Sequence, residues 1–239
     1  MKLDILAFGA HPDDVELSCS GTIAKEVSLG KKIGIIDLTR GELGTRGSAE
    51  IRDAEAAAAA VILGVSIREN LRFRDGFFLN DEKHQLEIIK KIRQYQPEIV
   101  LCNAVDDRHI DHGKGSKLVS DACFLSGLSK IETFDEKGVK QEAWRPKQVY
   151  HYIQWKNLTP DFVVDITGFI DVKVNAVLAY ESQFYNSDSK EPVTPITSKN
   201  FLDSISYRAQ DLGRLVGVDY AEGFTVERCL AVNDLSKLV

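Results

Sequence analysis

Two short stretches of this sequence combine histidine and aspartate at spacings that suit a metal site. They are Gly9-Ala10-His11-Pro12-Asp13-Asp14 and Asp106-Asp107-Arg108-His109-Ile110-Asp111-His112. Together they contain three of the five histidines of the chain, and we expect structural roles for the other two, His84 and His151. Taken alone, the first stretch could be the capped start of a helix, and the second a charged surface loop.

Two histidines and one carboxylate with an open coordination position form a catalytic zinc site, whereas a closed structural site more often uses cysteines. His11, Asp14 and His112 make up such a set, and we predict that they are the metal ligands. A bound zinc lowers the pKa of its water to about 7 and polarises a carbonyl oxygen. Because the same ligands accept iron, the sequence leaves open whether Zn²⁺ or Fe²⁺ is the native metal.

A hydrolytic site also needs a base beside the water and a group that holds the developing oxyanion. Asp13, next to the ligand Asp14, can point at the water and act as the general base. His109 lies one helical turn before His112 and can stand beside the metal as an imidazolium, with Asp111 as its partner. This arrangement is suited to metal-assisted hydrolysis of an amide.

The elements that must position these residues alternate between strands and helices in the first half of the chain. We expect strands at 3–8, 33–38, 70–73 and 99–102, because these segments are short apolar runs. Helical patterns lie between them: one ends near residue 29, one contains the alanine run 56–60, and one covers 82–95. Strands that are apolar on both faces and alternate with helices predict a doubly wound, mainly parallel α/β sheet.

The second half of the chain is less regular. It contains strand-like segments at 149–154 and 162–166, helical segments at 172–181 and about 201–215, and a polar loop at 186–199. We find no internal repeat and no low-complexity linker. The sequence therefore predicts a single domain, residues 1–239, with an irregular C-terminal part.

Strand order explains why the two stretches belong together. In the usual doubly wound order 3-2-1-4, the first and fourth strands are neighbours, and the loops that follow them diverge at the topological switch point. The two stretches follow these two strands directly, so we expect both to face one crevice. Three histidines converging there by accident is improbable, which favours the metal site over the two structural alternatives.

Composition excludes several other classes of protein. The formal net charge is −6, whereas general nucleic-acid binding needs a basic face. No lysine or arginine run suggests attachment to anionic membranes, and no apolar stretch reaches transmembrane length or resembles a signal peptide. The four cysteines are scattered without a C-x-x-C pair, so we expect reduced, partly buried thiols and a cytoplasmic protein.

The two stretches resemble the A-H-P-D-D and H-x-D-H signatures of the LmbE-like (PIG-L) zinc-dependent de-N-acetylase family. The similarity reaches nearly the whole chain, because it extends to Thr39-Arg40-Gly41-Glu42-Leu43-Gly44-Thr45-Arg46-Gly47, Arg52, Tyr180-Glu181-Ser182-Gln183 and Tyr220-Ala221-Glu222-Gly223-Phe224. This resemblance implies a Rossmann-like fold and a hydrolase that removes the acetyl group from an N-acetylglucosaminyl compound.

The resemblance also implies roles for single residues. It makes His11, Asp14 and His112 the zinc ligands and Asp13 the general base. His109 becomes the residue that stabilises the tetrahedral intermediate, and Arg52 a contact to the sugar hydroxyls. Some relatives carry a tyrosine near the start of the last long helix, where it donates to the reacting oxygen. Here the matching position is Phe201, so the oxyanion depends on the metal, on His109, or on a residue that the sequence does not identify.

Within this family the chain is most similar to the bacillithiol biosynthesis deacetylases, which act on N-acetylglucosaminyl-malate and often form hexamers. The resemblance therefore implies a homo-oligomer and a small, anionic amino-sugar substrate. A dianionic malate would suit Arg40, Arg46, Arg52 and Arg108, all of which we expect near the mouth of the crevice. Of these, we predict Arg52 and Arg108 as substrate-binding residues.

Three rival functions remain. A dinucleotide-dependent oxidoreductase would fit the fold, but the loop after the first strand lacks Gly-x-Gly-x-x-Gly. A non-catalytic metal- or sugar-binding protein would keep the ligands without needing Asp13 or His109. A family member with another amide substrate is the strongest rival: a deacetylase of N-acetylglucosamine or chitooligosaccharides, or an amidase of thiol conjugates.

Overall fold

The computed structural model describes residues 1–234, which form seven strands and six helices. The strands are β1 (Ile5–Gly9), β2 (Ile33–Thr39), β3 (Ile67–Phe73), β4 (Ile99–Cys102), β5 (Gln148–Tyr152), β6 (Phe162–Asp165) and β7 (Ala221–Val226). The helices are α1 (Asp14–Ser28), α2 (Ala49–Leu63), α3 (Glu82–Tyr95), α4 (Ile110–Ser126), α5 (Ile170–Leu178) and α6 (Lys199–Arg214).

All seven strands belong to one sheet in the order β3-β2-β1-β4-β5-β7-β6. The pairs from β3 to β5 are parallel, whereas β7 runs antiparallel to both of its neighbours. The predicted order 3-2-1-4 is therefore confirmed, as is the mainly parallel α/β fold. The antiparallel strand β7 and the helix α4 were not predicted.

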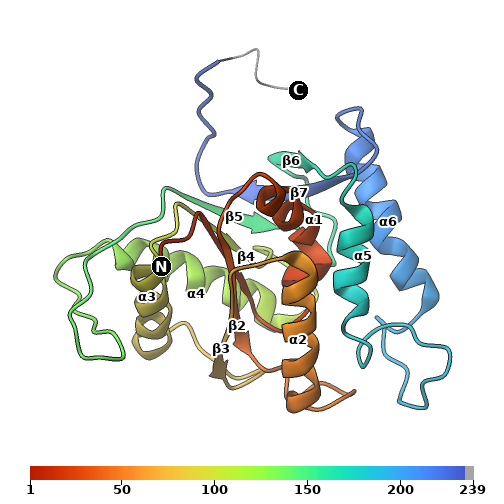
Figure 1. Ribbon diagram of the computed structural model, residues 1–239, viewed down its shortest axis with the longest axis horizontal. Helices are drawn as coiled ribbons and strands as arrows, with labels where there is room; N and C mark the ends of the chain where they lie inside the picture. The colour runs from red at the N-terminus through yellow and green to blue at the C-terminus, as the bar shows by residue number, and fades with distance from the viewer. Residues whose placement is uncertain (235–239) are drawn as a thin grey trace.

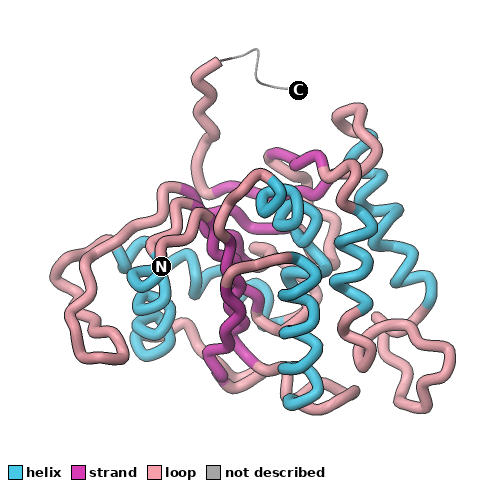
Figure 2. The backbone as a smooth tube through the Cα atoms, viewed as in Figure 1, coloured by secondary structure: helices cyan, strands magenta, loops and turns pink. Residues whose placement is uncertain are grey.

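The helices cover both faces of the sheet (Figure 1). Helices α3 and α4 lie on one face and α1, α2, α5 and α6 on the other, and Figure 2 shows the strands enclosed between these layers. Each face has its own apolar core: Phe8, Ile89 and Leu118 belong to the first, and Ala7 and Ile23 to the second. Because alternate residues of one strand enter different cores, the central strands are apolar on both faces.

Local chemistry explains where the helices begin and end. The Ser48 hydroxyl accepts a hydrogen bond from the Ile51 amide at the start of α2, and the Asp81 carboxylate caps α3 in the same way. Helix α2 ends at Gly64, whose φ of 69° is accessible to glycine at little cost. The expected boundaries agree with the observed ones to within a few residues, and α3 and β4 coincide with the prediction.

Helix α1 is interrupted in its middle, at Cys19, where φ is −139° and ψ is 17°. A buried ion pair satisfies backbone groups that the interruption leaves free. The Glu222 carboxylate accepts from the Gly21 amide at 3.0 Å, and Lys173 Nζ donates to the Leu17 carbonyl at 2.8 Å and to Glu222 at 2.6 Å. Residues of α5 and β7 thereby fix the direction of the first turn of α1, which contains the predicted ligand Asp14.

No helix within residues 1–234 combines the length and the apolar composition that crossing a membrane requires.

Candidate active site

The two predicted stretches meet at the carboxyl edge of the sheet. Strands β1 and β4 are paired directly, with Ala7 opposite Leu101, so the loops that follow them lie side by side. A cavity of about 410 Å³ lies at this edge, and His11, Asp13 and His112 line it. The predicted crevice between these loops therefore exists, and it extends between β5, β7 and α6.

The predicted ligand Asp14 lies between the two predicted histidine ligands. Its Oδ1 is 3.1 Å from His112 Nε2, and its Oδ2 is 3.6 Å from His11 Nδ1. Ligands placed about 2.1 Å from a tetrahedral metal are separated from one another by roughly 3.4 Å. Each of the two observed distances is close to that separation, with a different oxygen of Asp14 facing each histidine.

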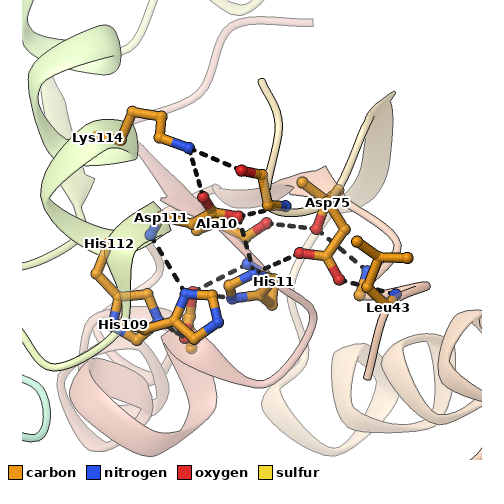
Figure 3. A network of polar contacts seen from close by, with 12 residues as sticks. Ala10, His11, Leu43, Asp75, His109, Asp111, His112 and Lys114 are labelled. Atoms are coloured by element: carbon orange, nitrogen blue, oxygen red, sulfur yellow. Dashed lines mark hydrogen bonds and ion pairs between the residues drawn. The ribbon is translucent and has the colours of Figure 1, made fainter. Parts of the chain in front are cut away.

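The other nitrogen of each histidine has a carboxylate partner. His11 Nε2 is 3.0 Å from Asp75, as Figure 3 shows. His112 Nδ1 is 2.5 Å from Asp107. Histidines that bind a metal almost always engage their second nitrogen in this way, which fixes the ring and its tautomer. The nitrogens left over are the two that face Asp14, so this donor set fits a divalent cation.

The charges at the site also fit a bound divalent cation. Burial alone would lower the pKa of His112, but the carboxylates of Asp14 and Asp107 raise it to about 9. The pKa of His11 is also raised against the effect of burial, by Asp111, Asp14 and Asp75. Carboxylates thus outnumber the lysine and arginine side chains around two buried imidazoles, and a divalent cation would balance this excess of negative charge.

Two groupings bring one ligand atom from each residue to within 4.8 Å of one another: His11 with His109 and His112, and His11 with Asp75 and Asp111. The predicted set is not one of these two, and in it Asp14 turns a different oxygen toward each histidine. We favour Asp14 as the third ligand. Within residues 1–234, its ion-pair partners are the two histidines alone, with no lysine or arginine. Buried charges in proteins are paired or coordinate a metal, and these two histidines can serve Asp14 either as charged partners or as fellow ligands.

Two buried amides that sequence reasoning missed hold the Asp14 carboxylate. Asn103 Nδ2 donates to its Oδ2 at 3.0 Å, and Gln154 Nε2 donates to its Oδ1 at 3.1 Å. Asn103 in turn accepts from the Ala10 amide and donates to Gln154. Asn103 follows β4 and Gln154 follows β5, so their position after parallel strands is the signal that would have pointed to them.

The predicted base, Asp13, occupies an unusual backbone conformation. It is the N-cap of α1 with φ of 106°, and thus directly precedes the first helical turn. Its carboxylate is 3.0 Å from Arg52 Nη2, and Arg52 also donates to the Pro12 carbonyl. Burial raises the pKa of Asp13 to about 7, although Arg52 acts in the opposite direction.

His109 is the N-cap of α4, and this corrects the expected role of Asp111. His109 Nδ1 accepts from the Asp111 backbone amide at 3.2 Å, while the Asp111 carboxylate contacts His11, Lys114 and the Gly76 amide. Burial and the neighbouring histidines lower the pKa of His109, which favours neutral imidazole over the expected imidazolium. Because Nδ1 is an acceptor, the neutral ring carries its hydrogen on Nε2.

Comparison with known proteins identifies the family of this chain. Residues 6–123 match the family described as PIG-L: GlcNAc-PI de-N-acetylase. Over 231 residues the chain is 30% identical to diacetylchitobiose deacetylase of Thermococcus kodakarensis, with 92% of this chain and 81% of that protein covered. The chain belongs to the PIG-L de-N-acetylase family.

Two other proteins are similar to this PIG-L family member, one in structure and one in sequence. The conserved protein TT1542 from Thermus thermophilus has a similar structure, with a TM-score of 0.85 and 34% identity over 99% of this chain and 100% of that one. Mycothiol S-conjugate amidase of Streptomyces coelicolor is 29% identical over 183 residues, 63% of this chain and 60% of that protein. Family membership makes this chain an enzyme of the de-N-acetylase type.

The four arginines expected at the mouth of this de-N-acetylase site differ in their surroundings. Arg40 pairs with Asp53 and Glu50, and Arg46 contacts Ser189 and Glu191; neither lines the cavity, contrary to expectation. Arg52 lines it but is engaged by Asp13. Arg108 lines it with its guanidinium 4.6 Å from the centre of the Trp155 ring. The sequence also missed Arg208 of α6, which lines the same cavity.

Proposed function

We propose that this protein is a zinc-dependent hydrolase that removes the N-acetyl group from an N-acetylglucosaminyl compound. The observation that carries the proposal is the position of Asp14 between His11 and His112, with the carboxylate of Asp13 beside them in one cavity. Family membership supports the reaction type. His11, Asp14 and His112 would hold the zinc, which lowers the pKa of a bound water and polarises the acetyl carbonyl.

In this mechanism Asp13 takes the proton of the attacking water and passes it to the departing amine nitrogen. The ion pair with Arg52 holds its carboxylate in one orientation, and the strained backbone of Asp13 aims it into the cavity. Replacing Arg52 would therefore disturb the base as well as any contact that this arginine makes with the sugar.

His109 serves as a hydrogen-bond donor to the acetyl oxygen as negative charge develops there. Its Nδ1 is fixed as an acceptor at the start of α4, so Nε2–H is the free donor, and its ring centroid lies 4.6 Å from that of His11 and 5.1 Å from that of His112. Phe201, which stands in place of the tyrosine of some relatives, stacks between Trp155 and Phe184 and has no donor to offer. The oxyanion therefore relies on His109 and the metal.

For the substrate we propose N-acetylglucosaminyl-malate, as in bacillithiol biosynthesis. The support is the likeness of the sequence motifs, together with Arg108, which lines the cavity without a carboxylate partner within residues 1–234. A second candidate is a chitooligosaccharide, because the relative of 30% identity is a diacetylchitobiose deacetylase.

Acetate release from N-acetylglucosaminyl-malate, N-acetylglucosamine and diacetylchitobiose by the purified, zinc-loaded protein separates these candidates. We expect the highest kcat/KM for the malate conjugate, and loss of all activity after dialysis against a chelator, with recovery on zinc addition. A preference for diacetylchitobiose would replace the first candidate by the second. Full activity without bound metal would overturn the proposed reaction itself.

A further inference from the structure

One arginine of the cavity wall has no anionic partner in the part of the chain that the structure describes. Arg208 lies on α6, lines the cavity beside the predicted site and is partly buried. Its Nη2 donates to the backbone carbonyl of Gln154, and burial lowers its pKa. A guanidinium has five N–H donors, so Arg208 keeps several of them for another acceptor.

The neighbouring carboxylates do not satisfy this charge. Asp13, which also lines the cavity, pairs with Arg52. Asp107 acts on Arg208 electrostatically but is bound by His112 Nδ1 at 2.5 Å and by the Lys156 amide at 2.8 Å. Arg208 therefore lines the cavity without an ion-pair partner of its own among residues 1–234, and a partly buried charge of this kind is costly unless a ligand supplies the anion.

Arg108 is a second cavity-lining arginine without a carboxylate partner in residues 1–234, and it contacts the same part of the cavity wall as Arg208. Arg108 stacks on Trp155, and Arg208 bonds the carbonyl of the preceding residue, Gln154. The two guanidinium groups reach this dipeptide from different elements, the loop before α4 and helix α6. Neither has a carboxylate within ion-pair distance in residues 1–234, in contrast to Arg52 across the cavity.

We propose that Arg208, together with Arg108, forms a carboxylate-binding subsite that selects substrates with an acidic aglycone. The inference rests on the proposed function. It assigns recognition of the anionic group to Arg208 and Arg108 in place of Arg52. Guanidinium groups bind carboxylates through paired hydrogen bonds. In the proposed complex, a carboxylate of the substrate is the ion-pair partner of Arg108 and Arg208. Arg52 instead stays paired with Asp13, the proposed general base.

The variant Arg208→Gln tests the subsite, with Arg214→Gln as the matched control. Arg214 lies on the same helix, its side chain is 70% exposed, and it pairs with Asp211 away from the cavity. The substrates are N-acetylglucosaminyl-malate and its dimethyl ester, which differ in charge at the aglycone alone. We expect Arg208→Gln to lower kcat/KM about 10- to 100-fold for the diacid, mainly through KM, with less than a threefold effect on the ester.

A purely structural role predicts another pattern. If Arg208 only anchors α6 to the end of β5, Arg208→Gln should slow both substrates equally and lower the zinc content or the melting temperature. Either that result or the absence of an effect on both substrates overturns the subsite. The control should keep the preference for the diacid. If the wild type cleaves neither substrate, the proposed function fails, and calorimetric binding of glucosaminyl-malate then tests the subsite alone: equal affinity of wild type and Arg208→Gln refutes it.

Discussion

Replacing Asn103 by leucine tests whether the fold, rather than the motif alone, holds Asp14, the proposed metal ligand. Asn103 is fully buried and does not line the cavity, so the substitution cannot act through contact with substrate. It removes the hydrogen bond to the Asp14 carboxylate and leaves the Ala10 amide without its acceptor. The side chains of asparagine and leucine are similar in size, which limits the packing change.

The expected loss follows from those two bonds. A hydrogen bond to a charged group contributes about 1.5–3 kcal/mol, and an orphaned buried amide costs about 1–3 kcal/mol, so the free energy of unfolding should fall by about 2.5–6 kcal/mol. For a chain of this size that lowers the melting temperature by about 5–24 °C. Because Asp14 loses one of the two side-chain amides that orient it, zinc affinity should fall about 10- to 100-fold.

Thermal unfolding of the metal-free protein measures the first effect, and competition with a chromophoric chelator measures the second. Asn157→Leu, at an exposed loop position, is the control and should change neither quantity. A destabilised Asn103→Leu protein with wild-type zinc affinity would refute the reasoning, because it would show that Asp14 needs no orientation by its amide donors.

Three further predictions concern the chemistry and the pH dependence. Asp13→Asn should retain about one zinc per chain but lower kcat by 10²- to 10⁴-fold, measured by acetate release; an unchanged rate would exclude it as the base. His112→Ala should abolish zinc retention in elemental analysis, and wild-type zinc content in this variant would remove His112 from the ligand set. Burial would lower the pKa of His151, but Cys102 and Glu227 raise it to about 10. The folded protein therefore binds this proton more tightly than the unfolded chain, whose histidine titrates near 6.5, so the stabilisation is complete below pH 6.5 and is lost as pH rises towards 10. The melting-temperature difference between wild type and Glu227→Gln should accordingly shrink over that interval, and a constant difference would contradict the pairing.

Much of the fold was predictable because the central strands are apolar on both faces and follow one another in a simple alternation. The two site loops could be placed together for the same reason, since strand order alone made β1 and β4 neighbours. Strand β7 escaped prediction because it carries Glu222 and Gly223 among its apolar residues, so its sequence has no continuous apolar run. Helix α4 escaped because its site residues resembled a charged loop.

The predicted contact between His109 and Asp111 failed for a reason that the sequence contains. Residues two apart at a helix start do not share a face, so a side chain at the N-cap meets the backbone amide two residues later rather than the carboxylate there. Asp75 and Asn103 were missed because neither belongs to a recognisable motif. Each lies one or two positions beyond a parallel strand, and the sheet alone brings them to His11 and Asp14.

The orientation of Asp13 illustrates how little of the site the motif itself determines. A φ of 106° at a non-glycine residue costs about 1–3 kcal/mol and persists where surrounding contacts over-determine it. Those contacts come from distant elements. Arg52 of α2 pairs with the Asp13 carboxylate, and the ion pair between Lys173 and Glu222 holds the interrupted helix α1 in place. A His-Pro-Asp-Asp sequence on another fold would relax into an ordinary helix start. Tertiary structure therefore orients the proposed base, and we expect the same four residues without α2, α5 and β7 not to form a hydrolytic site.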